Sequence, residues 1–362
     1  MSIPTVTVIM ATYNHAPFVK QAMKSVLAQE GVEFEFLIAD DGSSDETREV
    51  IAGILDSRVK FFPNTVNRGA CIVTNELIER SSGEFIALIN SDDYWLSPDK
   101  LAYQIKILRD RPDVGACFGR ASFVNKNGDR IDKKTLAFGN TFDQKNRSQG
   151  AWLRRFFEFG NCICHPTILI RKACYEEIGM YNNQLRQLPD FDMWIRLVKH
   201  YNIYISEREL ISFRVLPGEN ASSQTVPNAI RTINEHFLIA LNFFDDIKAS
   251  QLIDGFSDYL VIQNIPSEQH LDIEKARLFF IENQWLGKPY KMVGLPKMYS
   301  LLSSPRHREL MCNTYGLDDR WFQKEMATVD TLRPMVIEQI KQNTNKIISA
   351  FHVFIKMFRK KT

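Results

Sequence analysis

Two pairs of adjacent carboxylates follow apolar runs in this sequence, and a third acidic cluster lies further along the chain. These clusters are Asp40-Asp41, Asp92-Asp93 and Asp190-Phe191-Asp192. Adjacent carboxylates repel each other unless a hydrogen-bond donor, a cation or water lies between them. Hard divalent cations such as Mg²⁺ or Mn²⁺ take carboxylate oxygens together with the oxygens of a diphosphate. The pair Asp92-Asp93 is therefore either a metal and diphosphate site or a solvated loop.

Asp190 opens an amphipathic helical pattern in which Met193, Trp194 and Leu197 face the core. The dipole of a helix keeps a carboxylate at its N-terminus ionised, and an ionised carboxylate beside a pocket can take a proton from a hydroxyl. Asp190 is therefore a candidate general base. The alternative is a simple helix cap.

Short β-branched runs alternate with helical stretches over the first 120 or so residues, and these elements must position the acidic clusters. Strands are predicted at 5–10, 34–39, 59–62, 85–90 and 114–118. Strand and helix in alternation imply right-handed crossovers and an α/β fold, with a mostly parallel sheet covered by helices on both faces. Ligands bind beyond the carboxyl ends of such strands, where this sequence concentrates its polar residues.

The alternation loosens after Gly119. A hairpin is predicted at Asn127-Gly128, a mobile loop at 133–149, and two short strands at 203–205 and 211–215. From about Pro227 the pattern is almost wholly helical. We therefore expect two regions, 1–224 and 225–362.

Four segments together resemble the family 2 glycosyltransferases. The family's opening motif matches Val8 to Asn14, and its Asp-Asp-Gly-Ser motif matches Asp40 to Asp45. Its metal motif matches Asn90 to Trp95, and its catalytic segment matches Pro189 to Leu197. Any one motif is weak, but four in the right order and spacing are specific. The resemblance covers residues 4–224 and implies the GT-A fold, a Rossmann-like sheet flanked by helices, with inverting transfer.

The resemblance also implies roles for individual residues. Asp190 would be the general base, and Asp92 and Asp93 would hold the metal, with Asp92 also on the donor ribose. Departures from the family pattern are Asn90, in place of the first metal-motif aspartate, and Pro189, in place of the acid before the base. The donor-binding residues would be Thr12, Tyr13, Asn14, Asp41, Arg68, Asp92 and Arg214.

His165 lies where the family assembles its acceptor side. It is either a contact for the donor phosphate or acceptor, or a structural histidine packed beside a strand start.

The function implied is transfer of a sugar from a nucleotide-diphosphate donor, with a UDP-sugar favoured, to a hydroxyl of a glycan or polyprenyl-linked acceptor. The cofactor would be Mn²⁺ or Mg²⁺, and the process would be bacterial surface polysaccharide synthesis. One alternative, a sugar nucleotidyltransferase, would need a Gly-rich phosphate loop after the first strand, which Thr12-Tyr13-Asn14-His15 lacks. The other alternative is a non-catalytic nucleotide-sugar-binding or scaffold subunit.

Composition excludes several partners and locations. A net charge of +2 gives no global field to recruit nucleic acid. No signal peptide and no membrane-spanning run is visible, so we expect a cytoplasmic protein. The six cysteines are interpreted as reduced, buried thiols. The apolar, basic-ended segment 346–361 either lies on an anionic inner-membrane surface or packs against a helix or a second subunit in a homo-oligomer.

Overall fold

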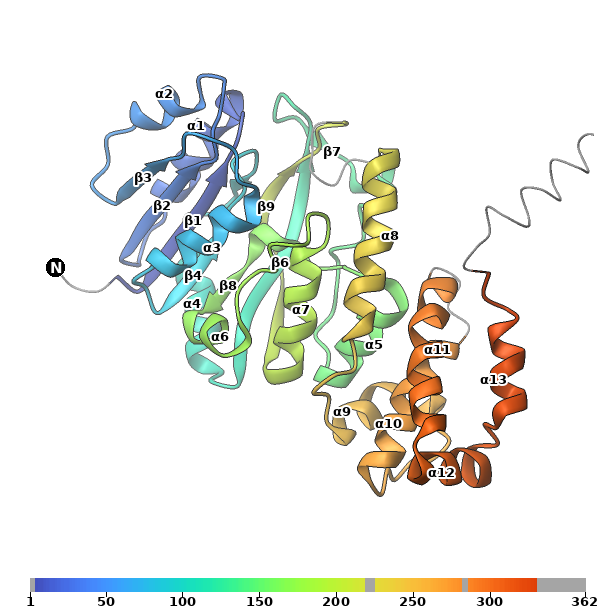
Figure 1. Cartoon of the computed structure of the whole chain (residues 1–362). Coiled ribbons are helices and arrows are strands. Elements are labelled where there is room, and N and C mark those ends of the chain that lie inside the picture. Colours follow the sequence, from blue (N-terminus) through green and yellow to red (C-terminus); the bar gives the residue numbers. More distant parts are fainter. Residues whose placement is uncertain (1–3, 219–224, 282–285, 331–362) are drawn as a thin grey trace, which may run out of the picture. The chain divides into compact units, whose positions relative to one another are not determined.

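The computed structural model describes residues 4–218, 225–281 and 286–330 (Figure 1). Contacts within the chain divide it into two units. The first comprises Met1–Ile265 and Asn283–Pro289, and the second comprises Pro266–Glu282 and Tyr290–Thr362. The predicted membrane or subunit contact at 346–361 lies outside the described residues.

Apolar, β-branched runs form the parallel half of the sheet in the first unit. Strand β1 (Val6–Thr12) lies between β2 (Phe34–Asp40) and β4 (Phe85–Leu88), and β3 (Val59–Pro63) lies beside β2. Register places Thr12 opposite Asp40, and Ile9 opposite Leu88. The carboxyl ends of these strands, with the polar residues that follow them, therefore meet at one edge of the sheet, as the sequence predicts.

Alternation along β1 separates a packed face from a face that borders a cavity. Val6, Val8 and Met10 are fully buried in the core. Ile9 and Ala11 point to the opposite face and line a cavity. Three helices pack their apolar sides into the same core as Val6: α1 (Ala16–Leu27), α2 (Thr47–Ala52) and α4 (Lys100–Asp110). Helix α3 (Ala70–Arg80) contacts β1 and lines the cavity face.

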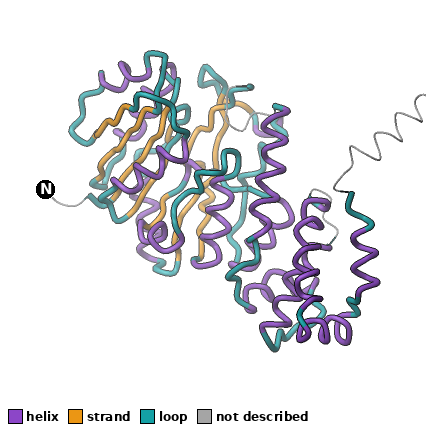
Figure 2. Tube along the Cα trace, viewed as in Figure 1, coloured by secondary structure: helices purple, strands orange, loops and turns teal. Residues whose placement is uncertain are grey.

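The other half of the sheet mixes directions. Strand β8 (Leu169–Arg171) pairs antiparallel with β4 on one side and with β6 (Val114–Val124) on the other. Strand β7 (Arg130–Ile131) pairs antiparallel with β6, which confirms the hairpin predicted at Asn127-Gly128. Gly128 there has a φ of 93°, a left-handed conformation that glycine adopts without strain. Figure 2 shows these strands side by side in orange.

The strands predicted at 203–205 and 211–215 are confirmed as strand up to Arg214, but their prediction as two separate strands is wrong. They form one strand, β9 (Asn202–Arg214), parallel to β6, with β5 (Tyr94–Trp95) antiparallel on its other side. Polar residues Ser206 to Glu209 suggest a break in the sequence. Register shifts in the pairing around Arg120 let the ladder continue past them.

Helices complete the first unit. Ser148 caps α5 by accepting a hydrogen bond from the Ala151 N–H. Helix α5 packs against α7 and α9. Although α8 and α9 fall in the region 225–265, their contacts assign them to the first unit. The bounds are α5 (Gln149–Phe159), α6 (Lys172–Ile178), α7 (Pro189–His200), α8 (Val226–Leu241) and α9 (Ala249–Phe256).

The second unit is helical where it is described, as the sequence predicts. Its helices are α10 (Glu268–Arg277), α11 (Gly287–Ser303), which starts in the last residues of the first unit, α12 (Pro305–Tyr315) and α13 (Asp319–Met326). Its core contains Ile273, Ala276, Met298, Leu302, Met311 and Leu317. Within the described part of the chain, no helix has the length and apolar character needed to cross a membrane.

The cysteines are free thiols. Cys117, Cys162, Cys164 and Cys174 are buried as predicted, and Cys71 is partly buried. The prediction of burial is wrong for Cys312, which is exposed. Cys312 lies on α12, a largely polar helix in which the adjacent Met311 is the buried residue, so the next position along the helix falls on the solvent side.

Candidate active site

A cavity of about 490 Å³ lies beyond the carboxyl ends of β1 and β4 in the first unit. Ala11 and Asp92 line it on the sheet side, and Asn161, His165 and Asp190 line it from the later part of the chain. The structure therefore brings two of the three predicted acidic clusters to one space. This is the position at which open α/β sheets bind ligands.

Asp92 and Asp93 differ in their surroundings although they are adjacent. Asp92 lines the cavity. Asp93 is 2% exposed, and its carboxylate accepts hydrogen bonds from the Arg214 N–H at 2.8 Å and from Asn90 Nδ2 at 3.0 Å. Burial, together with the negative charge of Asp92, raises the pKa of Asp93 well above its usual range. Burial also raises the pKa of Asp92, although His15 and Arg214 oppose this.

Arg214 supports the turn that carries these carboxylates. Its guanidinium donates to the carbonyl oxygens of Asp92 at 2.8 Å, Asn125 at 2.9 Å and Lys126 at 2.8 Å, and to Gln21 Oε1 at 2.8 Å. The residue is 2% exposed and does not line the cavity. Arg214 was predicted to hold the diphosphate, and the structure places its guanidinium on backbone carbonyls instead.

Asp41 and Arg68 lie beside each other at the turn before α3. The Asp41 carboxylate accepts the backbone N–H groups of Arg68 at 2.8 Å and Gly69 at 2.9 Å. Gly69 has a φ of 96°, and this left-handed turn makes both donors available to one carboxylate. The Arg68 guanidinium forms a two-pronged ion pair with Glu76, at 2.6 Å for each contact. Both predicted donor contacts therefore already have partners within the chain.

The end of β1 presents three different side chains. The Thr12 hydroxyl is buried and finds no hydrogen-bond partner among the described residues. Such a group costs roughly 1 to 3 kcal/mol unless a ligand or water pairs with it. The Tyr13 side chain is 45% exposed. Asn14 holds the neighbouring loop, since its Oδ1 accepts the Ser44 N–H at 2.9 Å.

Asp190 is a carboxylate in the first turn of α7 and is not the helix cap, because the N-cap residue is Leu188. Asn161 Nδ2 donates to Asp190 Oδ2 at 2.7 Å, and the Phe191 N–H donates to Oδ1 at 2.8 Å. Burial raises the pKa of Asp190 to about 6 against the effect of these hydrogen bonds. Such a group is ionised at neutral pH and basic enough to accept a proton.

His165 forms a neutral wall of the cavity. Its Nε2 lies 2.8 Å from the hydroxyl of Tyr181, which also lines the cavity. Burial lowers the pKa of His165 to about 4, so the ring is uncharged at neutral pH. His165 can therefore exchange hydrogen bonds with a ligand but adds no positive charge.

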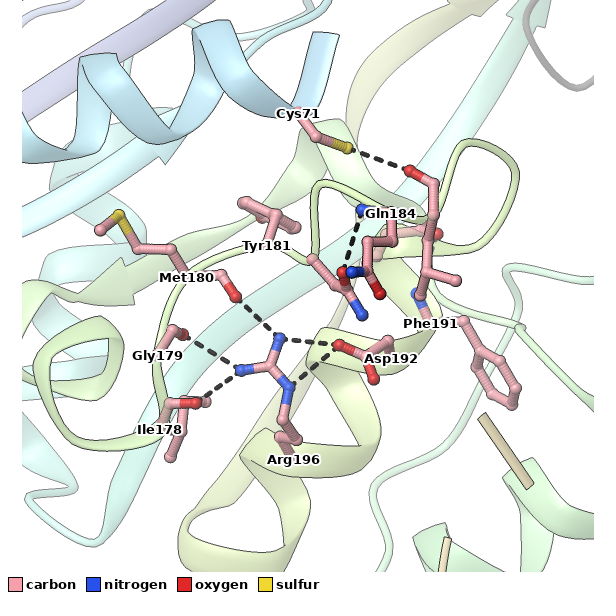
Figure 3. A network of polar contacts seen from close by, with 12 residues as sticks. Cys71, Ile178, Gly179, Met180, Tyr181, Gln184, Phe191, Asp192 and Arg196 are labelled. Atoms are coloured by element: carbon pink, nitrogen blue, oxygen red, sulfur yellow. Dashed lines mark hydrogen bonds and ion pairs between the residues drawn. The ribbon is translucent and has the colours of Figure 1, made fainter. Parts of the chain in front are cut away.

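Arg196 of α7 holds the start of the segment that connects α6 to α7 (Figure 3). Arg196 donates to the carbonyl oxygens of Ile178 at 2.6 Å, Gly179 at 3.2 Å and Met180 at 2.9 Å. The same guanidinium pairs with Asp192 at 2.8 Å, as the dashed lines show. Arg196 thus holds the start of the segment 179–188, which contains no helix or strand and leads into α7 and Asp190.

Comparison with known proteins agrees with this geometry. Residues 7–177 match the family described as glycosyl transferase family 2. The chain is 31% identical over 239 residues to an uncharacterized glycosyltransferase of Haemophilus influenzae, a match that covers 66% of this chain and 89% of that protein. The chain belongs to glycosyltransferase family 2. This family membership confirms the resemblance read from the four motifs.

One further relative has a described reaction. It is an Escherichia coli protein, the UDP-Glc:alpha-D-GlcNAc-diphosphoundecaprenol beta-1,3-glucosyltransferase WfgD, and it is 34% identical over 122 residues. That match covers 34% of this chain and 47% of WfgD.

Two solved structures share the fold of this family 2 member. S. aureus TarS 1-349 in complex with UDP-GlcNAc has a TM-score of 0.56 and 17% identity, covering 90% of this chain and 91% of that one. The mannosyltransferase PcManGT from Pyrobaculum calidifontis, in complex with GDP-Man and Mn²⁺, has a TM-score of 0.52 and 16% identity, covering 88% and 86%. The GT-A fold expected from the sequence is confirmed.

The carboxylates of this protein suit a divalent cation that takes only one or two ligands from the protein and the others from the substrate. Over residues 4–218, 225–281 and 286–330, no three His, Cys, Asp or Glu side chains are grouped as a metal-binding cluster. Mg²⁺ and similar ions, however, are commonly bound by one or two carboxylates together with substrate phosphates. Asp92 on the cavity wall, beside the buried carboxylate of Asp93, meets that requirement.

Three site residues were not foreseen from the sequence. None of the four family motifs includes them. Asn161 donates a hydrogen bond to Asp190, Arg186 lines the cavity, and Glu235 accepts the Arg186 N–H. Asn161 is close to His165 in the chain, so its place near the site could have been suspected. Nothing in the sequence around Glu235 distinguishes it from a solvent-facing residue of an amphipathic helix.

Proposed function

We propose that this protein is an inverting glycosyltransferase that moves a sugar from a nucleotide-diphosphate donor, with a UDP-sugar favoured, to a hydroxyl of a glycan or lipid-linked acceptor. The observation that carries the proposal is the shared cavity, in which Asp92 on one wall faces the same space as Asp190 on the other. The UDP-GlcNAc bound to TarS, and the diphosphoundecaprenol acceptor named for WfgD, support the substrate classes.

Asp190 performs the proton transfer in this proposal. Its ionised carboxylate, oriented by Asn161, takes the proton of the acceptor hydroxyl as that oxygen forms its bond to the anomeric carbon. The bond from the anomeric carbon to the donor diphosphate breaks on the opposite side, so the configuration inverts. The proton ends on Asp190 and the bonding electrons leave with the nucleoside diphosphate.

Donor recognition is assigned to the strand ends around β1. The Thr12 hydroxyl, which has no hydrogen-bond partner in the described part of the chain, and the exposed Tyr13 ring are available for the nucleotide base. Asp41 and Arg68 shape the adjoining turn. Asp92, supported by Asp93, would hold Mn²⁺ or Mg²⁺. When bound, the ion would supply Lewis-acid stabilisation of the charge that develops on the leaving diphosphate. The Mn²⁺ bound in PcManGT supports this part of the proposal.

The setting we propose is assembly of a bacterial surface polysaccharide by a cytoplasmic enzyme at the periphery of the inner membrane. WfgD, whose described acceptor is lipid-linked, supports this setting. Residues 225–362 would take part in acceptor, membrane or subunit contacts. The corresponding test is co-sedimentation with anionic vesicles of the full chain and of a chain ending at Thr344, and equal behaviour of the two would contradict a role for 346–361.

Transfer from a panel of UDP-, GDP- and dTDP-sugars to a bacterial lipid extract, with and without Mn²⁺, tests the function. We expect one donor to support transfer, and Asp190→Asn to reduce it by about 10³-fold or more while a nucleoside diphosphate still binds. Asp110→Asn is the matched control, since Asp110 is an exposed partner of Lys106 on α4. Undiminished transfer by Asp190→Asn would refute the assigned base. Donor binding without turnover would favour the scaffold alternative.

A further inference from the structure

Neither of the two arginines predicted to bind the donor, Arg68 and Arg214, lines the cavity. It contains the carboxylates Asp92 and Asp190, and the proposed function adds a diphosphate to the same space. Arg68 is paired with Glu76, and Arg214 is engaged with backbone carbonyls outside the cavity lining. Negative charges gathered in one cavity oppose binding unless positive charge balances them, and one divalent cation falls short of balancing two carboxylates and a diphosphate.

Arg186 is the only lysine or arginine among the described residues that line the cavity. Its side chain is exposed, and no hydrogen bond or ion pair of its guanidinium is found with any described residue. The lining continues from Arg186 through Gln187, Leu188 and Pro189 to Asp190. A cation is therefore carried on the same short segment as the proposed base.

Glu235 of α8 fixes the backbone of that segment. Its Oε1 accepts the Arg186 N–H at 2.9 Å, and its Oε2 accepts the N–H groups of Gln187 and Leu188, each at 2.8 Å. Glu235 is 4% exposed, so its charge is stabilised by these three donors in a largely dry environment. Thr232, three residues earlier on the same side of α8, lines the cavity itself. Helix α8 therefore belongs to the wall of the site.

We propose that Arg186 binds phosphate oxygens of a substrate in this cavity, and that Glu235 positions Arg186 by holding the backbone of residues 186–188. The planar guanidinium offers paired N–H donors that match two oxygens of a phosphate. Its charge offsets part of the negative charge that Asp92 and Asp190 bring to the cavity. The inference rests on the proposed function only for the identity of the substrate, because either the donor diphosphate or an acceptor phosphate could supply the oxygens.

Inorganic pyrophosphate with Mn²⁺ is the first probe, because it carries no base or sugar. Calorimetry should show binding to the wild type that weakens about 10- to 100-fold in Arg186→Gln and less in Arg186→Lys. Arg130→Gln is the matched control, since Arg130 is exposed and pairs with Glu209 away from this cavity. Unchanged affinity in Arg186→Gln, or no binding to the wild type, would overturn the proposal.

Glu235→Gln separates positioning from simple electrostatics. Removal of a negative charge near the cavity should, by Coulomb's law alone, strengthen pyrophosphate binding. Loss of positioning should weaken it, because the amide presents an N–H to backbone donors that need an acceptor. We expect a weakening of about 10-fold, with a melting temperature that shows the variant to be folded. Stronger or unchanged binding would remove Glu235 from the proposal.

Two further titrations identify the source of the phosphate. If Arg186→Gln weakens binding of UDP but not of uridine, Arg186 contacts the donor diphosphate. If it spares UDP but weakens farnesyl diphosphate titrated into UDP-saturated protein, Arg186 contacts an acceptor phosphate. If neither UDP nor farnesyl diphosphate is affected, the proposal fails. Arg186-dependent pyrophosphate binding in a protein that transfers no sugar would preserve this subsite and reject the transferase assignment.

Discussion

Asn161 donates a hydrogen bond from its Nδ2 to Asp190 Oδ2 across 2.7 Å, and burial raises the pKa of this carboxyl to about 6. Asp190 must be ionised to accept a proton, so kcat/KM should rise with pH through about 6 and level off above it. A pH profile in constant ionic strength measures this limb. A flat profile from pH 5 to 8, with chemistry shown to be rate-limiting, would contradict the assignment.

Asn161→Ala removes the side-chain hydrogen bond that favours the charged form of Asp190. The pKa of Asp190 should therefore rise further, and the acidic limb of the profile should move up by about 1 to 2 pH units. Asn202→Ala is the control, since Asn202 is exposed, donates from its Nδ2 to Asp113 and does not line the cavity. A lower rate with an unmoved limb would show that Asn161 acts on something other than this proton.

Asp92→Asn and Asp93→Asn should have different effects. Asp92 lines the cavity, so its loss should abolish the Mn²⁺ dependence of nucleoside diphosphate binding and mimic treatment with a chelator. The Asp93 carboxylate contacts Asn90 and the Arg214 N–H, so Asp93→Asn should retain part of the Mn²⁺ effect. Calorimetry of UDP with and without Mn²⁺ compares them. Equal loss in both variants would show that the metal needs both carboxylates directly.

Arg196→Ala should lower the free energy of unfolding by about 2 to 4 kcal/mol, because it leaves three backbone carbonyls and Asp192 without their donor. Urea denaturation measures this change. Hydrogen exchange should also become faster in the segment around Gly179 than in the strands. Arg109→Ala, at a long and exposed contact with Glu84, should change stability by less than about 0.5 kcal/mol.

Lys100 is fully buried on α4, where its ammonium donates to Gln104 and lies over the Trp95 ring. Burial lowers the pKa of Lys100 from 10.5 to about 7. Between these values the unfolded chain binds more protons than the folded one, so wild-type stability should rise with pH, by roughly 5 kcal/mol at most. Lys100→Met should remove this rise and be the more stable protein at pH 6. Parallel stability curves for the two proteins would contradict the shift.

Sequence reasoning succeeded where local pattern determines structure. The strands β1, β2 and β4 are mainly apolar runs, and the polar residues after them lie at one edge because parallel strands share a direction. It failed where pairing is distant. Strand β5 has two residues and exists only through its bonds to β9, and β9 continues through a polar stretch because β6 accommodates it with register shifts.

The site shows the same division. Asp92 and Asp190 could be predicted because motif and position indicated them, and the structure places both on one cavity. The partners of Arg68 and Arg214 could not be predicted. The sequence alone does not indicate whether an arginine side chain binds a ligand, a carboxylate or a backbone carbonyl. Glu235 escaped notice for a related reason, since the backbone N–H groups that donate to its carboxylate lie almost 50 residues away in the sequence.

Strand β9 lies between β6 and β5, although both of those strands precede it by many residues in the chain. During synthesis from the N-terminus, β6 is complete at Val124 while its neighbour ends at Arg214. The edge of β6 that pairs with β9 therefore stays open in the nascent chain until residues 202–214 have been synthesised. Over the same interval the Asp93 carboxylate lacks the hydrogen bond that the Arg214 N–H donates to it in the complete protein. Chains whose synthesis stops between Val124 and Arg214 should depend on chaperones, and binding of the donor should first appear in chains that extend beyond Arg214.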